Sequence, residues 1–76
     1  MLSRDRVEID PAICSGKPVV RGTRILVTST LSQLAAGGSF DIIRKGFPGL
    51  SDDDIKAAIE FAKQSVEATE LASLRD

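Results

Sequence analysis

The feature that most constrains this chain is the absence of the covalent and metal links that usually stabilise a small protein. Its 76 residues include one cysteine, Cys14, and no histidine. A single cysteine excludes an internal disulfide, and without histidine a zinc site has almost no ligands. A chain of this length forms one domain, whose core rarely supplies more than about 3–5 kcal/mol. We therefore expect a partner chain to add stability, as in a homodimer.

Two helices are predicted in the middle of the sequence. Thr28 is a candidate N-cap for a first helix, which Gly37-Gly38 ends because glycine tolerates the left-handed conformation of a helix end. Ser39 is a candidate N-cap for a second, short helix, which Pro48-Gly49 ends.

The strongest helical pattern begins at Ser51. Ser51 and Asp54 have the spacing of a capping box. The apolar residues that follow recur at helical spacing and form a stripe of Ile55, Ala58, Ile59, Ala62 and Val66. This pattern predicts a third helix, which lies where the recognition helix lies in a helix-turn-helix module.

Short strands are predicted before the helices. Val7 and Ile9 alternate with polar residues, which favours a short strand. The β-branched runs 18–20 and 25–27 flank Gly22, which can adopt the positive φ of a tight turn, so we expect these runs to pair as a hairpin. The predicted fold is α+β and mainly α: a short N-terminal β-hairpin followed by a three-helix, homeodomain-like (helix-turn-helix) bundle.

Catalytic and cofactor chemistry has little support in the residue types. Without histidine, neither Cys14 nor any serine has an imidazole base. The segment "SGKP" does not match a phosphate-binding loop, because Pro18 occupies the position of the required hydroxyl residue. The run 52–54 of three aspartates lacks the spacing of a calcium loop and instead complements the positive end of the third helix. We expect no enzymatic activity, no cofactor and no bound metal.

Membrane and export signals are also missing from the sequence. No apolar run reaches the length of a membrane span, and the first six residues are charged rather than signal-like. We therefore expect a cytoplasmic protein that makes no membrane contact.

Two stretches, "EIDPAICSGKPVVRGTRILV" and "LSQLAAGGSFDIIRKGFPGLSDDDIKAAIEFA", together resemble the small bacterial family known as domain of unknown function 433. The resemblance covers about residues 7 to 65. It is carried by Asp10-Pro11, Gly16-Lys17-Pro18, the Arg21–Arg24 turn, Phe47-Pro48 and the helix from Ser51 to Ala62. It implies a winged-helix or homeodomain-like fold, and a role as the antitoxin beside a PIN-like ribonuclease toxin.

Basic residues are enriched at the N-terminal end. Residues 1–27 carry five basic and three acidic residues, whereas residues 28–76 carry five basic and eight acidic ones. In the segment "GKPVVRGTRILV", Lys17, Arg21 and Arg24 gather around a tight turn. Three interpretations remain open: contacts with DNA phosphates, ion pairs at a dimer or toxin interface, and bonds to Asp10 and backbone carbonyls of the same chain.

The aspartates at 52–54 would repel phosphates if the third helix entered a DNA groove, so operator DNA would have to be held by cations elsewhere. The candidate residues for binding nucleic acid or a partner are Lys17, Arg21, Arg24, Arg44 and Lys45, with Lys56 and Lys63 in a secondary role. A protein-interaction module that makes no DNA contact is the alternative function.

The last ten residues form a separate segment of the predicted organisation. Residues 1–66 make up the domain, and residues 67–76 either extend the third helix or fray. In the helical case, Leu71 and Leu74 lie on a stripe rotated away from the core stripe and bind a partner. The acidic residues of this segment then face a basic rim on the partner: Glu67, Glu70 and Asp76.

Overall fold

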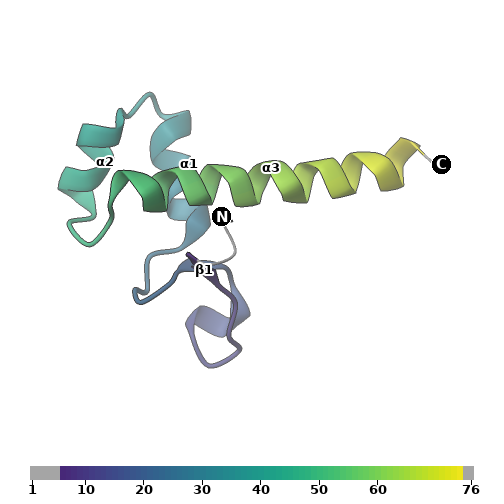
Figure 1. Ribbon diagram of the computed structural model, residues 1–76, viewed down its shortest axis with the longest axis horizontal. Helices are drawn as coiled ribbons and strands as arrows, with labels where there is room; N and C mark the ends of the chain where they lie inside the picture. Colours follow the sequence, from purple (N-terminus) through teal and green to yellow (C-terminus); the bar gives the residue numbers. More distant parts are fainter. Residues whose placement is uncertain (1–5, 75–76) are drawn as a thin grey trace.

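The computed structural model describes the backbone of residues 6–74 and the side chains of residues 6–69. Two short strands, β1 (Val7–Glu8) and β2 (Val19–Val20), precede three helices, and a single 3-10 turn, η2 (Cys14–Gly16), lies between the strands. The helices are α1 (Val27–Ala35), α2 (Phe40–Gly46) and α3 (Asp52–Leu74). The predicted class, α+β and mainly α with a small antiparallel sheet before three helices, is confirmed (Figure 1).

The sheet pairs β2 with a segment that the sequence did not predict as its partner. β1 runs antiparallel to β2, with Val7 opposite Val20 and Glu8 opposite Val19. The segment 25–27 also pairs antiparallel with β2, through a bridge between Val19 and Leu26 that has two backbone hydrogen bonds, of 2.9 and 3.0 Å. The predicted hairpin of 18–20 with 25–27 is therefore present but is limited to this one bridge, because Val27 already belongs to the first turn of α1 and leaves little chain to pair.

The turn between β2 and α1 has the conformation that its sequence predicts. Gly22 has a φ of 82°, as its position in the turn predicted. The Thr23 hydroxyl donates to the Val20 carbonyl at 2.8 Å and accepts from the Ile25 amide at 3.0 Å. These two bonds stabilise the turn locally.

The first two helices differ in how they begin. α1 starts one residue before Thr28, and its N-cap is Leu26, which makes no side-chain cap, so the predicted Thr28 cap is wrong. α2 is capped as predicted, because the Ser39 hydroxyl accepts from the Ile42 amide at 3.2 Å. Gly37, with a φ of 92°, ends the turn that follows α1.

The capping box of α3 is confirmed in both directions. The Asp54 amide donates to the Ser51 hydroxyl at 3.1 Å, and the Ser51 amide donates to an Asp54 carboxylate oxygen at 3.0 Å. The helix continues for 23 residues, beyond the last predicted core position at Val66. Its C-terminal part projects past α1, α2 and the sheet (Figure 1).

The core consists of two small clusters between α3 and the rest of the domain. One contains Val20, Ile43, Leu50 and Ile55, and the other contains Val7, Val27 and Ala58. α3 contacts α1, α2 and β1, so it is the element on which the others converge. Of the predicted stripe, Ile55 and Ala58 are buried, but Ile59 is 39% exposed and Val66 is 56% exposed. Ile59 therefore lies at the edge of the covered face, next to Ala58, and Val66 lies beyond the part of the helix that the domain covers.

Candidate functional site

Arg21, in the turn that follows β2, is held by its own chain. Its guanidinium donates to the Val7 carbonyl at 3.4 Å and lies 4.0 Å from a carboxylate oxygen of Glu8. Both partners belong to β1, so Arg21 links the two strands of the sheet. Asp10, the predicted intrachain partner, instead accepts from the Ala12 amide at 2.9 Å in a local turn.

Arg24 and Lys17 differ from Arg21. Both side chains are exposed, and neither forms an ion pair with a residue in the range 6–69. Arg24 lines a shallow surface pocket of approximately 350 Å³ together with Glu8, Ile13, Gly22 and Thr23. Of the three cations near this turn, Arg24 and Lys17 are therefore the two that an external anion can reach without breaking an ion pair.

Arg44, at the end of α2, is also committed to its own chain. It pairs with Asp41 in its own helix and with Asp52 at the start of α3. These contacts join α2 to α3 across the 47–51 connection. Its neighbour Lys45 is exposed and has no such partner among the described side chains.

The first turn of α3 has a second cationic partner, Arg6, which the sequence did not single out. Arg6 Nη1 donates to Asp54 Oδ1 at 3.1 Å, and Arg6 Nη2 lies 3.7 Å from Asp53 Oδ2. No signal in the sequence indicates this pairing, because it depends on the packing of β1, the strand that follows Arg6, on α3. Arg6 and Arg44 together neutralise much of the charge of the three aspartates.

Asp54 is the described group with a clearly shifted acidity. Partial burial favours its neutral form, but the hydrogen bonds from the Ser51 amide, Arg6 and the Ser51 side chain, together with the Arg6 charge, hold the pKa of Asp54 below its ordinary value. The carboxylate is therefore a structural anion that caps α3 and anchors the residue before β1.

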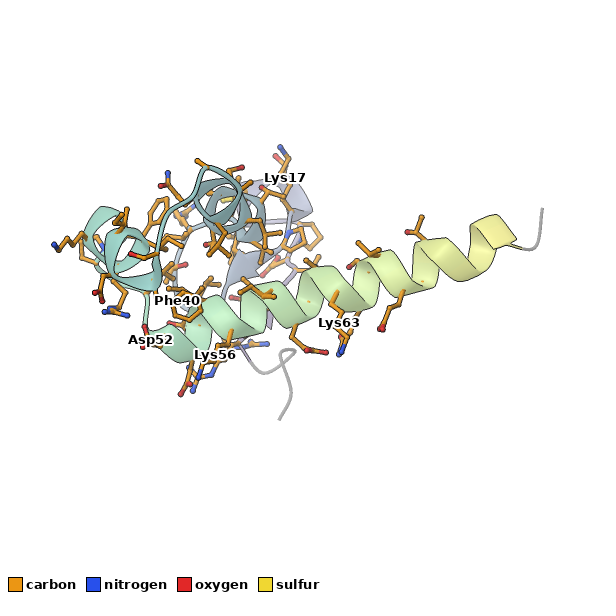
Figure 2. All side chains as sticks on the ribbon, turned by 90° about the horizontal axis from the view of Figure 1, so that it is seen from above. Lys17, Phe40, Asp52, Lys56 and Lys63 are labelled. Carbon is orange, nitrogen blue, oxygen red and sulfur yellow. The ribbon has the colours of Figure 1, made fainter. Side chains whose placement is uncertain are left out.

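Lys56 and Lys63 lie far from the turn cations. Both project from the side of α3 that faces away from the domain, whereas Lys17 lies across the domain on the other side (Figure 2). Lys63 lies 3.5 Å from Glu60, one turn earlier, and Lys56 has no ion pair with any residue between 6 and 69. The seven predicted cations therefore do not form one surface.

The projecting part of α3 is the largest feature that the domain leaves uncovered. All side chains from Ser65 to Thr69 are exposed, and Val66 is the largest apolar one among them. The predicted partner-binding residues Leu71 and Leu74 lie on the helical backbone of α3, but their side chains are outside the described residues.

Two other kinds of site are absent from the described residues. Among the side chains of residues 6–69, no group of histidine, cysteine, aspartate and glutamate residues is arranged to hold a metal ion. None of the described helices is long and apolar enough to cross a lipid bilayer.

Comparison with known proteins gives three matches. The model of the family described as "Protein of unknown function (DUF433)" matches residues 7–62. The uncharacterized protein y4eO of Sinorhizobium fredii (strain NBRC 101917 / NGR234) is 36% identical over 61 residues, which are 80% of this chain and 28% of that protein. The chain therefore spans little more than a quarter of that relative.

A solved structure has the same fold. The crystal structure of a DUF433 member protein from Anabaena variabilis ATCC 29413 matches with a TM-score of 0.77 and 26% sequence identity. The match covers 91% of this chain and 68% of that one. The arrangement of the small sheet and the three helices is therefore shared with that protein.

Proposed function

Because this chain belongs to the DUF433 family, whose description names no activity, we propose its function from its surface: it is a non-catalytic, antitoxin-type interaction module. It binds a protein partner through the part of α3 that projects beyond the domain. The partner we propose is a nuclease toxin of the PIN-like class, in the cytoplasm, in keeping with the antitoxin role that the sequence resemblance implied.

The observation that carries this proposal is the projection of α3. A helical segment without tertiary contacts is marginal in water, because most helix stability in proteins comes from packing one face. Residues 65–69 are nonetheless helical, and all five of their side chains are exposed. A partner that packs on this segment would give it the contacts that the domain does not supply.

The charge of α3 supports an electropositive partner surface. Residues 52–69 contain five acidic and two basic side chains. The arginines that neutralise the first turn leave Glu67 at the other end unpaired among residues 6–69. An acidic helix is complementary to a basic surface such as the nucleic-acid groove of a ribonuclease.

The test is a co-expression assay with the product of the adjoining gene, which the proposal requires to be a PIN-like ribonuclease. The full chain should rescue growth, and a chain lacking residues 67–76 should not. Circular dichroism and thermal melting should show that the truncated domain folds, because the core residues all precede residue 59. The matched control is Lys45→Ala, an exposed change on α2 that should leave rescue intact. Full rescue by the truncated chain would contradict the proposal.

A second candidate function, binding of operator DNA, is supported by four cations with no ion pair among residues 6–69. These are Lys17, Arg24, Lys45 and Lys56. The exposed carboxylates of Asp52 and Asp53 disfavour insertion of the start of α3 into a groove. Any DNA contact is therefore expected between these four cations and phosphates, and not by insertion of the first turn of α3 into a groove.

A salt titration separates the two functions. Binding to the DNA upstream of the gene should be weak. If DNA is a true ligand, the affinity should fall steeply with salt, with a log–log slope of about −0.9 for each phosphate neutralised. Affinity that does not change with salt, or no binding at low salt, leaves only the protein-interaction role.

A further inference from the structure

Four charged side chains lie along one exposed strip of α3. Lys56, Glu60, Lys63 and Glu67 fall within an arc of about 60° when each residue turns by about 100°. Figure 2 shows that Lys56 and Lys63 project from the same side of the helix, away from the domain. We refer to these four residues as the α3 charge strip.

A half-turn about the midpoint of the strip places each charged residue at the position of one with the opposite charge. Lys56 and Glu67 lie equally far from a point between residues 61 and 62, and so do Glu60 and Lys63. Each member of a pair carries the opposite charge to the other. When two such helices lie antiparallel, Lys56 of each is level with Glu67 of the other, and Glu60 is level with Lys63.

A single copy of the chain uses only half of this pattern. Lys63 contacts Glu60 at 3.5 Å, but Lys56 and Glu67 form no ion pair with any residue in the range 6–69. The two ends of the strip are thus a cation and an anion, about 16 Å apart along the helix, each without a described partner. Each of them has its complement on a second, antiparallel copy.

Exposed apolar side chains lie beside the strip. Ile59 and Val66 are both partly exposed and lie two turns apart on one edge of it. In the antiparallel arrangement, Ile59 of one copy lies within about two residues of Val66 of the other along the axis. The apolar pair therefore forms a seam that the charge strip borders.

We propose that this face of α3 is a two-fold interface at which a second copy of the same chain packs antiparallel. The interface is isologous, because the same residues contribute from both copies. It uses residues 56–67 and so overlaps the projecting segment assigned to the partner protein only at residues 65–67, where the two surfaces meet.

Charge reversal tests the pairing directly in the full chain, without any partner protein. Lys56→Glu and Glu67→Lys should each raise the dimer dissociation constant about tenfold, because each replaces two attractive contacts by two repulsive ones. The double variant K56E/E67K should restore the wild-type value. An equal mixture of the two single variants should form mixed dimers in preference to either homodimer. Sedimentation equilibrium over a range of concentrations measures all of these species.

The control variant is Lys45→Glu, which changes the net charge by the same amount on an exposed part of α2. It should dimerise as the wild type does, and melting curves should show that all variants fold. The proposal is overturned if the wild type is monomeric at every concentration, if the single variants dimerise as well as the wild type, or if the double variant does not recover. None of these outcomes depends on whether a toxin binds.

Discussion

Arg6 and Asp54, which are 48 positions apart in the chain, are joined by a 3.1 Å hydrogen bond from Nη1 to Oδ1. The same carboxylate accepts the Ser51 amide at 3.0 Å, and so closes the capping box of α3. One side chain therefore fixes the start of the longest helix and also anchors the residue that precedes β1. Loss of this carboxylate should therefore weaken both the start of α3 and the attachment of the segment before β1.

Acidification should test this anchor. The pKa of Asp54 is lowered in the folded protein, so its contribution is present above the ordinary aspartate pKa of about 3.9 and is lost as the pH falls through the lowered value. Asp54→Asn should cost about 1 kcal/mol at neutral pH, and its unfolding free energy should fall less steeply below about pH 4. Urea denaturation at several pH values measures both effects. Asp53→Asn, at a more exposed carboxyl group, should change neither by as much.

A buried hydroxyl on α1 offers a stabilising change. Thr30 is fully buried, and its Oγ1 has no hydrogen-bond partner within the described part of the chain. Thr30→Val keeps the shape and removes the unpaired hydroxyl, so it should raise the unfolding free energy by about 1 kcal/mol. Thermal melting compares it with Thr28→Val, an exposed change on the same helix that should be nearly neutral. A lower melting temperature for the Thr30 variant would show that the hydroxyl has a partner in solution.

A side chain at Gly22, in the turn after β2, should be unfavourable because of the backbone conformation alone. A Cβ at Gly22 would meet no atom within 4 Å, but the residue has a φ of +82°. Gly22→Ala should therefore destabilise the domain by about 1–2 kcal/mol. Gly49 is equally open and is not left-handed, so Gly49→Ala should cost much less. Equal melting temperatures for the two variants would contradict this account.

The two arginines of that turn should behave differently when replaced. Arg21→Ala removes the contacts to Val7 and Glu8, and should lower the unfolding free energy by about 0.5–1.5 kcal/mol. Arg24→Ala removes an exposed side chain without an ion pair among residues 6–69, and should leave stability unchanged. Denaturant titration of both variants measures the difference. If Arg24→Ala proves the more damaging change, the roles of the two residues are the reverse of those described.

Local signals predicted much of the helical part of the fold. Ser39 and the pair Ser51 and Asp54 cap their helices as the sequence indicated, because each cap depends on residues only three positions apart. Gly22 has the predicted left-handed backbone because that conformation depends on the glycine itself and its place in a tight turn. These features need no knowledge of the rest of the chain.

The sheet and the charge pairing depend on contacts between distant segments. A two-residue strand carries too short a pattern to show that β2 pairs with 7–8 as well as with 25–27. The packing of β1 on α3 brings that second partner into place. Likewise, nothing near Arg44 in the sequence shows that it faces Asp52, and nothing near Arg6 indicates Asp54. The seven cations were therefore grouped by charge, while the structure divides them among separate surfaces.

The projection of α3 also fixes the direction around the helix axis in which a segment joined to its end would point. A helix turns by about 100° and advances about 1.5 Å with every residue, so a segment joined to the end of α3 would inherit a defined rotational phase relative to the core around Ile55 and Ala58. One residue inserted after Val66 would swing that segment to a different side of the domain while hardly changing its distance. The domain thus sets the rotational orientation of any segment joined to the end of α3.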